Sequence, residues 1–316
     1  MKTRTLLVVV AASALGAWWY LFEYDALPVP GNFRVDWKEA RALAGTGGPR
    51  SVHTERVAEG EFFGWMLMAG AGWSREPMDF RSYQLVYADG QTIMIDAVQD
   101  RALHESMPLM GSYDDAAWEH QRAALREASR IVITHEHYDH VGGLAALMNE
   151  AAVVSRIYIS AAQRNSERLH DSGFTDTAIA TLPPADYTGM HRLAPGVVLI
   201  AAPGHTPGSQ IVYVRMDDGA EYAFLGDIVW NSRNLLEHRA KGVLIGLLAG
   251  EDHAQLDPQI AWFGRELSST TIRFVITHDP AWNAALIERG MLVPGFALRN
   301  PDDETLVSFS SASTRN

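Results

Sequence analysis

Short apolar runs separated by turn-forming residues recur along the chain from Phe62 onwards. Runs of this length, bounded by glycine, proline or aspartate, are typical of β-strands. Between two of them lies Asp89-Gly90, a dipeptide that favours a tight hairpin turn. The segments that this pattern predicts as strands are 63–68, 83–88, 92–95, 130–134, 156–160, 197–201, 210–215, 222–225 and 273–277.

Helical spacing of apolar residues appears between these predicted strands. It is clearest at 116–128, and further helices are predicted at 144–148, 161–169 and 258–267. Two mixed sheets packed face to face, with helices outside and active-site loops at one edge, satisfy this interleaved order. We therefore expect an α/β domain at residues 31–316, with a frayed polar tail from Asp302 onwards.

The N-terminus has the pattern of an export signal. Lys2 and Arg4 precede an uncharged stretch, residues 6–22, and a proline-containing linker follows. Small residues near Ala14 would permit cleavage, whereas Trp18 to Tyr20 resemble the aromatic belt of a retained anchor. Both alternatives stay open, and a buried helix is disfavoured because the stretch lacks a polar face. Residues 1–30 are thus expected to direct export to the periplasm or cell envelope, with possible membrane attachment.

Composition narrows the partners and the chemistry. The formal net charge is -12, so a nucleic acid would be repelled and a small-molecule substrate is expected instead. The chain has no cysteine, which excludes disulfides, thiolate ligands and cysteine nucleophiles. A bound metal must therefore use histidine and carboxylate ligands. The composition does not define an oligomeric state.

The strongest chemical signal is the segment Thr134-His135-Glu136-His137-Tyr138-Asp139-His140, placed directly after a predicted strand. His135 and His137 are two positions apart, so in extended backbone their side chains point to the same side. Asp139 and His140, at the start of the next helix, can turn toward a neighbouring metal. A polar surface loop is the alternative, but four potential ligands within six residues favour a metal site.

Three further candidates each follow a predicted strand. They are His205 in a Pro-Gly-His-Thr-Pro-Gly turn, Asp227 after Phe224-Leu225-Gly226, and His278 after Phe274 to Thr277. Taken singly, each is as well explained by a turn-capping aspartate or a surface histidine. Together with the first cluster they give a repeated order of strand followed by ligand.

This order resembles that of the metallo-β-lactamase fold superfamily, over most of the chain from about Phe62 to Pro294. The resemblance implies a four-layered αββα sandwich with metals at one edge of the sheets. It also implies that His135, His137 and His205 hold one metal, that Asp139, His140 and His278 hold the second, and that Asp227 bridges them. Two zinc ions per chain are expected, with iron or manganese as alternatives. Asp96 resembles an early acid of the family that hydrogen-bonds a ligand histidine, although a turn aspartate is an equal alternative.

A hydrolase is the expected activity. Five neutral imidazoles and two carboxylates would leave two divalent ions with net positive charge, which stabilises a metal-bridging hydroxide. That hydroxide would attack the carbonyl of a small ester, lactone, thioester or amide, with Asp139 and Asp227 as the acidic residues of the catalytic centre. The absence of cysteine and the bridging Asp227 make the chain more similar to lactonases and glyoxalase II-like enzymes than to β-lactamases with a cysteine ligand.

Two other functions remain open. A sulfur dioxygenase-like oxidoreductase would use nearly the same ligands around a single iron, whereas a flavin-linked di-iron protein would have glutamate where this chain has His137. An inactive scaffold is the second alternative, although it has no need for seven converging polar groups.

Two expectations concern the rest of the chain. The tract 230–253, with Trp230, Asn231, Arg233, Arg239 and Lys241, is expected to form either a substrate-covering loop or a helix pair. The remaining histidines lack ligand spacing and are predicted on the surface: His53, His104, His120, His170, His191, His238 and His253.

Overall fold

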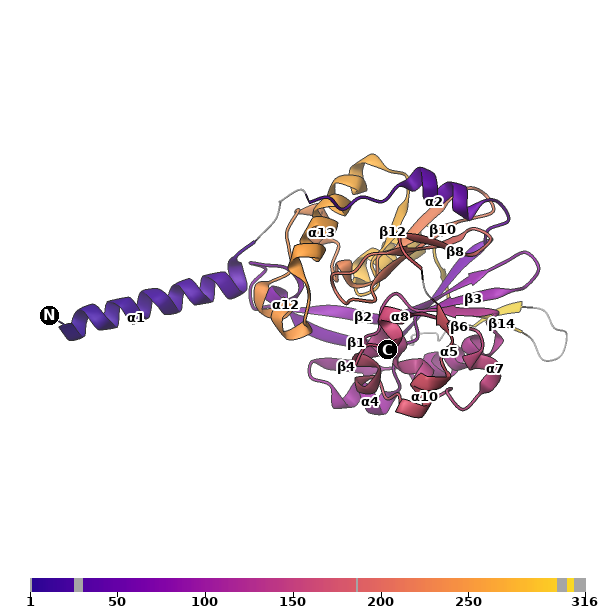
Figure 1. Ribbon diagram of the computed structural model, residues 1–316, viewed down its shortest axis with the longest axis horizontal. Helices are drawn as coiled ribbons and strands as arrows, with labels where there is room; N and C mark the ends of the chain where they lie inside the picture. The colour runs from indigo at the N-terminus through magenta and orange to yellow at the C-terminus, as the bar shows by residue number, and fades with distance from the viewer. Residues whose placement is uncertain (1, 26–30, 186, 300–305, 310–316) are drawn as a thin grey trace.

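The computed structural model describes residues 2–25, 31–185, 187–299 and 306–309. Two β-sheets face each other, and helices lie on their outer sides (Figure 1). This arrangement confirms the predicted αββα sandwich.

The first sheet has the strand order β13-β1-β2-β3-β5-β6-β7, with β4 paired to β1. Strands β1, β2 and β3 pair antiparallel, β13 pairs parallel with β1, and β3, β5, β6 and β7 run parallel to one another. The predicted hairpin at Asp89-Gly90 connects β2 to β3, with Gly90 at a φ of 79°. The strands are β1 (Ser51–Phe63), β2 (Arg75–Val86), β3 (Thr92–Ile95), β4 (Met110–Tyr113), β5 (Arg130–Val132), β6 (Ile157–Ser160), β7 (Pro184–Ala185) and β13 (Val293–Pro294).

The second sheet has the order β12-β11-β10-β9-β8. Both β9 and β11 pair antiparallel with β10, and β12 is parallel to β11, so β9, β11 and β12 run in one direction. A separate pair of strands, β14 (Phe296–Arg299) and β15 (Leu306–Phe309), follows near the C-terminus. The strands of the second sheet are β8 (Met190–Ala194), β9 (Val197–Ala201), β10 (Gln210–Arg215), β11 (Glu221–Phe224) and β12 (Arg273–Val275).

Apolar side chains fill the space between the sheets and beneath the helices. Leu85, Leu199 and Phe224 belong to the core between the two sheets. Helices α2 (Trp37–Ala44) and α13 (His253–Ser269) cover the second sheet, and α5 (Asp115–Glu127) and α6 (Tyr138–Ala145) cover the first. Shorter helices complete the layers: α3 (Gly64–Leu67), α4 (Arg101–Ser106), α7 (Ala151–Val154), α8 (Ala161–Arg164), α9 (Arg168–Asp171), α10 (Asp176–Thr181), α11 (Arg233–Leu236), α12 (Val243–Ala249) and α14 (Pro280–Glu288).

Several predicted boundaries are wrong. The segment 63–68 is not a strand, because β1 ends at Phe63 and the backbone turns through α3 to bury Trp65 and Leu67. The helix predicted at 144–148 begins at Tyr138, and the one predicted at 161–169 is divided into α8 and α9. Within the predicted frayed tail, Leu306–Phe309 form β15 and pair with β14, and residues 302–305 and 310–316 lie outside the described chain.

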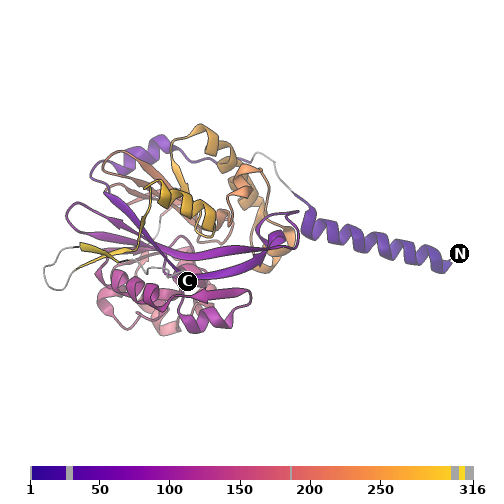
Figure 2. The same cartoon turned by 180° about the vertical axis from the view of Figure 1, so that it is seen from behind.

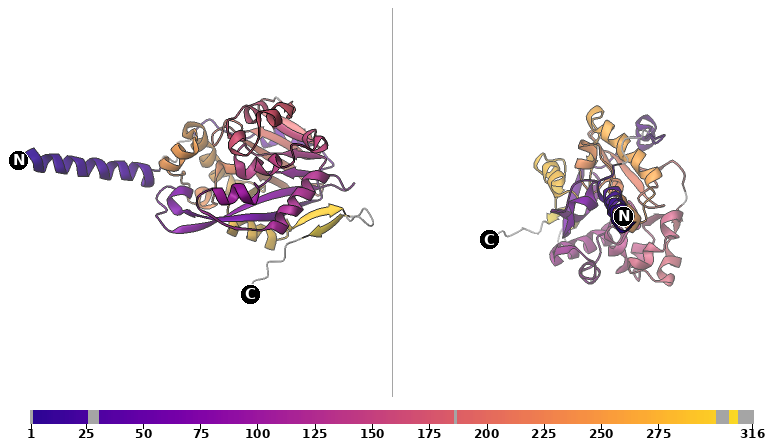
Figure 3. Two further views of the ribbon diagram at one scale, coloured as in Figure 1. Left: turned by 90° about the horizontal axis from the view of Figure 1, so that it is seen from below. Right: turned by 90° about the vertical axis from the view of Figure 1, so that its left-hand side faces the viewer.

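The N-terminal segment projects from the sandwich as helix α1 (Lys2–Trp18), continued by the π-helical turn η1 (Trp19–Glu23) (Figures 1, 2 and 3). Residues Thr5–Glu23 are long and apolar enough to cross a membrane, a property that signal sequences share. The apolar window of this segment is not buried, and only its last turn packs on the domain, through Phe22, so the alternative of a buried helix is wrong. Of the predicted linker, residues 26–30 lie outside the described chain.

Candidate metal centre

The candidate ligands gather where the strands of both sheets end. His135 and His137 follow β5, which runs parallel to β3 in the first sheet. The other three strand-end ligands, His205, Asp227 and His278, follow β9, β11 and β12, which share one direction in the second sheet. Because strands with a common direction end at the same edge, residues far apart in sequence meet there.

The seven residues form two groups that share one carboxylate. His135, His137, His205 and Asp227 make up the first, and Asp139, His140, Asp227 and His278 the second; in each, one ligand atom per residue lies within 4.8 Å of the others. Asp227 Oδ2 lies 3.3 Å from His205 Nε2, and Asp227 Oδ1 lies 3.1 Å from His278 Nε2. Asp227 thus presents one oxygen to each group.

Hydrogen bonds on the outer side of the imidazoles suit metal binding. His140 Nδ1 donates to Asp96 Oδ2 at 2.9 Å, and His278 Nδ1 donates to the Asp79 carbonyl oxygen at 2.7 Å. Because these acceptors hold a proton on Nδ1, the lone pair of each Nε2 points toward the centre. There, His140 Nε2 and His278 Nε2 lie only 3.1 Å apart.

A buried acceptor also remains unsatisfied at the centre. Within the described chain, Asp227 Oδ1 receives no hydrogen bond of good geometry. A buried carboxylate oxygen without a well-oriented hydrogen bond is costly, and a cation held between converging nitrogen and oxygen atoms would satisfy it. The donor set therefore fits divalent metal ions.

The electrostatics of the two groups differ. Burial and the neighbouring imidazoles hold the pKa of His135 and of His137 well below the usual value, so both rings are neutral at neutral pH. Burial opposes a charge on His140 as well, but the carboxylates of Asp139 and Asp227 outweigh it and raise the pKa of His140 well above the usual value. The carboxylates thus attract positive charge to the second group, as protons or as a metal ion.

Asp96 makes the contact that the sequence analysis suggested. Its Oδ1 accepts the Thr134 backbone N–H at 2.6 Å, and its Oδ2 accepts the Thr134 hydroxyl and the His140 ring. Asp96 has a φ of 62°, a left-handed conformation that aspartate tolerates better than most residues. It fixes the end of β3 against the segment that carries the first histidines.

A buried charge network around His205 was not predicted. Glu251 Oε1 accepts from His205 Nδ1 at 2.6 Å and from Lys241 Nζ at 2.7 Å, and Lys241 also donates to the backbone oxygen of Asp227 at 2.7 Å. Burial opposes the charge on Glu251, but Lys241 and His205 lower the pKa of Glu251 to about 2. No sequence pattern indicates this role, because an acid before a helix is ordinarily a cap, as Asp252 is for α13.

Glu136 lies within the ligand segment without belonging to either group. Its carboxylate accepts the Thr206 hydroxyl at 2.8 Å and the Gly208 backbone N–H at 3.3 Å. Burial raises the pKa of Glu136. This contact joins the segment of His135 to the turn that carries His205.

A pocket of about 580 Å³ opens above both groups. Polar residues of the centre, His137, Asp139, Asp227 and His278, lie at one side, together with Tyr138 and Arg168. Asp171 is a further polar residue of the lining, and the rest is apolar: Phe62, Met66, Met78, Phe80, Met107, Pro108, Trp230, Ile245, Leu248 and Ala249. The site can therefore bind a molecule with a polar reacting group and an apolar remainder.

The tract 230–253 contributes to this pocket as a pair of short helices rather than as an open loop. Trp230 and helix α12 line it, whereas Asn231, Arg233 and Arg239 do not. Trp230 Nε1 also donates to Asp227 Oδ2 at 2.6 Å. Of the five residues that the sequence analysis named in this tract, Trp230 lines the pocket. Lys241 does not line it but donates to Glu251 and to the Asp227 backbone oxygen.

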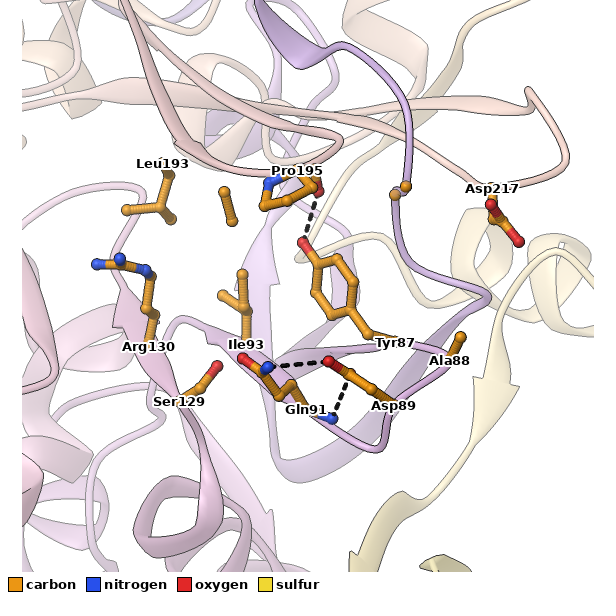
Figure 4. A pocket seen from close by; sticks show the side chains of 13 residues that line it. Tyr87, Ala88, Asp89, Gln91, Ile93, Ser129, Arg130, Leu193, Pro195 and Asp217 are labelled. Carbon is orange, nitrogen blue, oxygen red and sulfur yellow. Dashed lines mark hydrogen bonds between the residues drawn. The ribbon is translucent and has the colours of Figure 1, made fainter.

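A second pocket, of about 450 Å³, lies at the opposite edge of the sheets, where β3 and β5 begin (Figure 4). The Tyr87 hydroxyl donates to the Pro195 carbonyl oxygen there, and Asp89 accepts from Gln91. No histidine lines it, and it offers no converging ligand set among the described residues.

Two of the seven histidines predicted on the surface are buried. The Nδ1 of His53 lies 2.8 Å from the Gly295 carbonyl oxygen. The ring of His104 makes an edge-to-face contact with the ring of Phe80. Burial lowers the pKa of both rings, so each is kept neutral in the core. Neither is part of the metal centre.

Comparisons with known proteins identify the family of this chain. The family model of the Metallo-beta-lactamase superfamily matches residues 79–267, which include every candidate ligand except His278. An N-acyl homoserine lactonase of a Bacillus species is 31% identical over 107 residues, and one of Bacillus thuringiensis is 28% identical over 107 residues. These alignments cover 33% of this chain and 40% of the length of each relative.

Solved structures share the fold at low sequence identity. An N-acyl homoserine lactone hydrolase with N-hexanoyl-L-homoserine bound at its catalytic metal centre gives a TM-score of 0.57 at 14% identity, over 75% of this chain and 96% of that one. A probable metal-dependent hydrolase from Staphylococcus aureus gives 0.56 at 13% identity, over 86% and 100% of the two chains. With more than half of its residues matched by the family model and with the fold described above, the chain belongs to the metallo-β-lactamase superfamily.

Proposed function

We propose that this protein is a two-metal hydrolase that opens a lactone or cleaves a related small ester, thioester or amide. The observation that carries the proposal is the pair of ligand groups that share Asp227 at the side of an apolar pocket. His135, His137 and His205 would hold one ion and Asp139, His140 and His278 the other. Zinc is the first candidate for these nitrogen and oxygen ligands, with manganese or iron as alternatives.

The two ions would supply a water nucleophile activated at neutral pH and a Lewis acid for the carbonyl oxygen. Lactone hydrolysis adds one water across the acyl C–O bond, and the released oxygen must receive a proton. Asp139 lines the pocket beside His278, at 3.3 Å from its Nε2, and is the carboxylate we assign to this proton transfer. Asp227 accepts a hydrogen bond from Trp230 and would hold the two ligand groups at a constant separation.

Tyr138 and Arg168 are the neutral and positive donors that line the pocket. Burial raises the pKa of Tyr138, so its hydroxyl stays protonated and can donate to an oxygen of the substrate. Arg168 donates to the backbone oxygen of Ala249, which ties α9 to the end of α12 across the pocket. Both residues can orient a polar head while the apolar walls exclude water.

A lactone is favoured among carbonyl substrates because the relatives aligned above are N-acyl homoserine lactonases. The pocket volume, about 580 Å³, suits a small molecule. With a net charge of -12, the chain is a poor partner for nucleic acid. We assign the reaction to the periplasm or cell envelope, on the basis of the apolar N-terminal helix.

The proposal is tested by assaying the full-length protein, loaded separately with zinc, manganese and iron, against lactones, esters, thioesters and β-lactams. Ring opening of an acyl lactone with the zinc or manganese form is the expected result. Loss of this turnover in His137→Ala, with turnover retained in His170→Ala, would assign it to the centre, because His170 is exposed and lies in neither ligand group. Failure of every metal form on every carbonyl substrate would contradict the proposal.

Two alternatives give different results in the same experiment. A sulfur dioxygenase-like enzyme would bind a single iron and consume oxygen with a thiol-derived substrate, without hydrolysing lactones. An inactive scaffold would bind no metal. The unsatisfied Asp227 Oδ1 disfavours the scaffold, because burying this oxygen without a hydrogen bond or a metal ion would only lower the stability of the fold.

A further inference from the structure

We propose that the mouth of this pocket rests on a phospholipid bilayer and that the substrate is an amphiphile whose apolar chain reaches the pocket from the membrane. Docking of this surface on the bilayer does not depend on the catalytic activity. The second part rests on the proposed function, since it names the substrate class of the same centre.

The apolar N-terminal helix ends against the wall of the pocket. Phe22, in the last turn η1, packs on Trp65 and Trp73, with ring centroids 5.0 and 5.1 Å away. Phe22 and the pocket residues Met66 and Ile245 belong to one apolar cluster. The helix that can span a bilayer and the wall of the substrate pocket therefore form a continuous structure.

Polar contacts fix the same junction. The Gly70 backbone N–H donates to the Phe22 carbonyl oxygen at 2.8 Å, and the Ala240 backbone N–H donates to Asp25 Oδ1 at 3.0 Å. Arg239 Nε lies 3.5 Å from Asp25 Oδ2. Together these bonds attach the base of the helix to the tract that carries α12.

Exposed apolar side chains surround this junction. Leu247 and Leu248 on α12 are each 70% exposed, and Trp73 is 52% exposed. At the end of the apolar helix, Trp19 and Tyr20 are also about half exposed, at 52% and 51%. Tryptophan and tyrosine at the end of an apolar helix favour the level of the lipid headgroups. The leucines of α12 are therefore at the depth where a bilayer surface would cover them.

The views agree on this placement. Figures 1, 2 and 3 show helix α1 leaving the end of the molecule at which α12 lies. Leu248 is both exposed and part of the pocket lining, so it stands at the mouth. Because the chain carries a net charge of -12, we assign the surface to zwitterionic lipid, which does not repel it.

This placement restricts the substrate. An amphiphile that partitions into the bilayer would present its apolar chain to Leu248, Ile245 and Met66 while its carbonyl reaches the metal centre at the inner side. Membrane enrichment raises the local concentration of such a molecule, whereas a short-chain analogue in water gains nothing from it. A preference for long acyl chains is expected only when a membrane is present.

Docking is tested without any measurement of activity. The sequence has no cysteine, so Leu247→Cys in the full-length protein can be labelled at one site with an environment-sensitive fluorophore. In phosphatidylcholine vesicles containing spin-labelled lipid, we expect the label to be quenched about twofold, because an interfacial helix sinks its apolar face among the headgroups. Asp217→Cys, in the pocket at the opposite edge, is the control and should not be quenched (Figure 4). Equal quenching at the two positions would overturn the docking surface.

The substrate class is tested with the same vesicles and two acyl lactones, one short and water-soluble and one long-chained. We expect turnover of the long lactone to fall in Leu247→Asp, a variant outside the pocket lining, while that of the short lactone is unchanged. An unchanged rate for the long lactone would overturn entry from the membrane. If wild type hydrolyses neither lactone, the proposed function fails, and the quenching result still decides the docking surface.

Discussion

At the scale of single residues, the ligand histidines depend on the groups behind them. His205 is held by Glu251, His140 by Asp96 and His278 by the Asp79 carbonyl oxygen. Such partners set which nitrogen carries the proton and raise the basicity of the other. Only Asp96 could be anticipated from the sequence, because it follows a predicted strand as the ligands do, whereas Glu251 has no comparable position.

Replacing Glu251 by glutamine tests this support. Loss of the charged acceptor of His205 Nδ1 should weaken the first metal site about 10- to 100-fold, and chelator competition with zinc measures it. Asp252→Asn is the matched control, because the carboxylate of Asp252 itself caps α13 and does not contact a ligand. An equal loss of affinity in both variants would show that the effect comes from the helix end.

His137→Ala removes a ligand directly. It should abolish metal binding in the first group and turnover together, because His137 Nδ1 lies between His135 Nε2 and His205 Nε2, at 3.0 and 2.8 Å. His170→Ala should change neither metal content nor rate. Elemental analysis and lactone turnover of the two variants check this, and a fully loaded His137→Ala protein would disprove the ligand assignment.

The buried His53 gives a pH-dependent contribution to stability. Burial lowers its pKa from the ordinary 6.5 in the folded protein, so below pH 6.5 the unfolded chain takes up a proton that the folded one resists. The contribution is present above pH 6.5 and is lost as the pH falls toward the folded pKa. Urea unfolding should show that His53→Gln loses less stability between pH 7.5 and 5.5 than wild type does. An identical pH dependence would contradict the burial of a neutral ring.

At the scale of elements, the predicted bounds of a strand match the structure where turn-forming residues stand directly before and after its apolar run. The predicted bounds of β3, β9 and β10 are those of the structure, because turn residues close these buried strands at both ends. Strand β1 was largely missed, since Glu55, Arg56 and Glu59 interrupt its apolar pattern. Those charges are accommodated by ion pairs, such as Arg56 with Glu59, that only the folded chain reveals.

Helix α6 depends on close backbone approach at Gly143. Its N–H donates to the Ala97 carbonyl oxygen at 3.0 Å, and a Cβ at this position would lie 2.5 Å from the Val98 carbonyl oxygen. Gly143→Ala should therefore destabilise the protein by about 1–3 kcal/mol, as expected for an overpacked site. In Gly142→Ala the nearest atom, Gln99 Cβ, would be 3.0 Å away, so a smaller loss is expected. Denaturant midpoints of the two variants provide the comparison, and equal midpoints would contradict the close approach.

At the scale of the whole molecule, the sequence predicted which residues meet but not what surrounds them. Five of the candidate ligands converge because each follows a strand, and strand direction decides at which edge they gather, whereas Asp139 and His140 lie in the first turn of α6. The pocket walls come from α12, β1 and the loop near Met107, whose contacts depend on tertiary packing. No local pattern encodes such packing, so the apolar character of the pocket and its connection to the N-terminal helix emerge only from the structure.

The central claim is that the two groups sharing Asp227 bind two metal ions, and the metal content of the purified full-length protein tests it most directly. Elemental analysis should find about two zinc or manganese ions per chain, and about one after Glu251→Gln under competition with a chelator. One iron per chain would instead support the dioxygenase-like alternative. A protein that binds no metal under any loading condition would contradict the account of the centre.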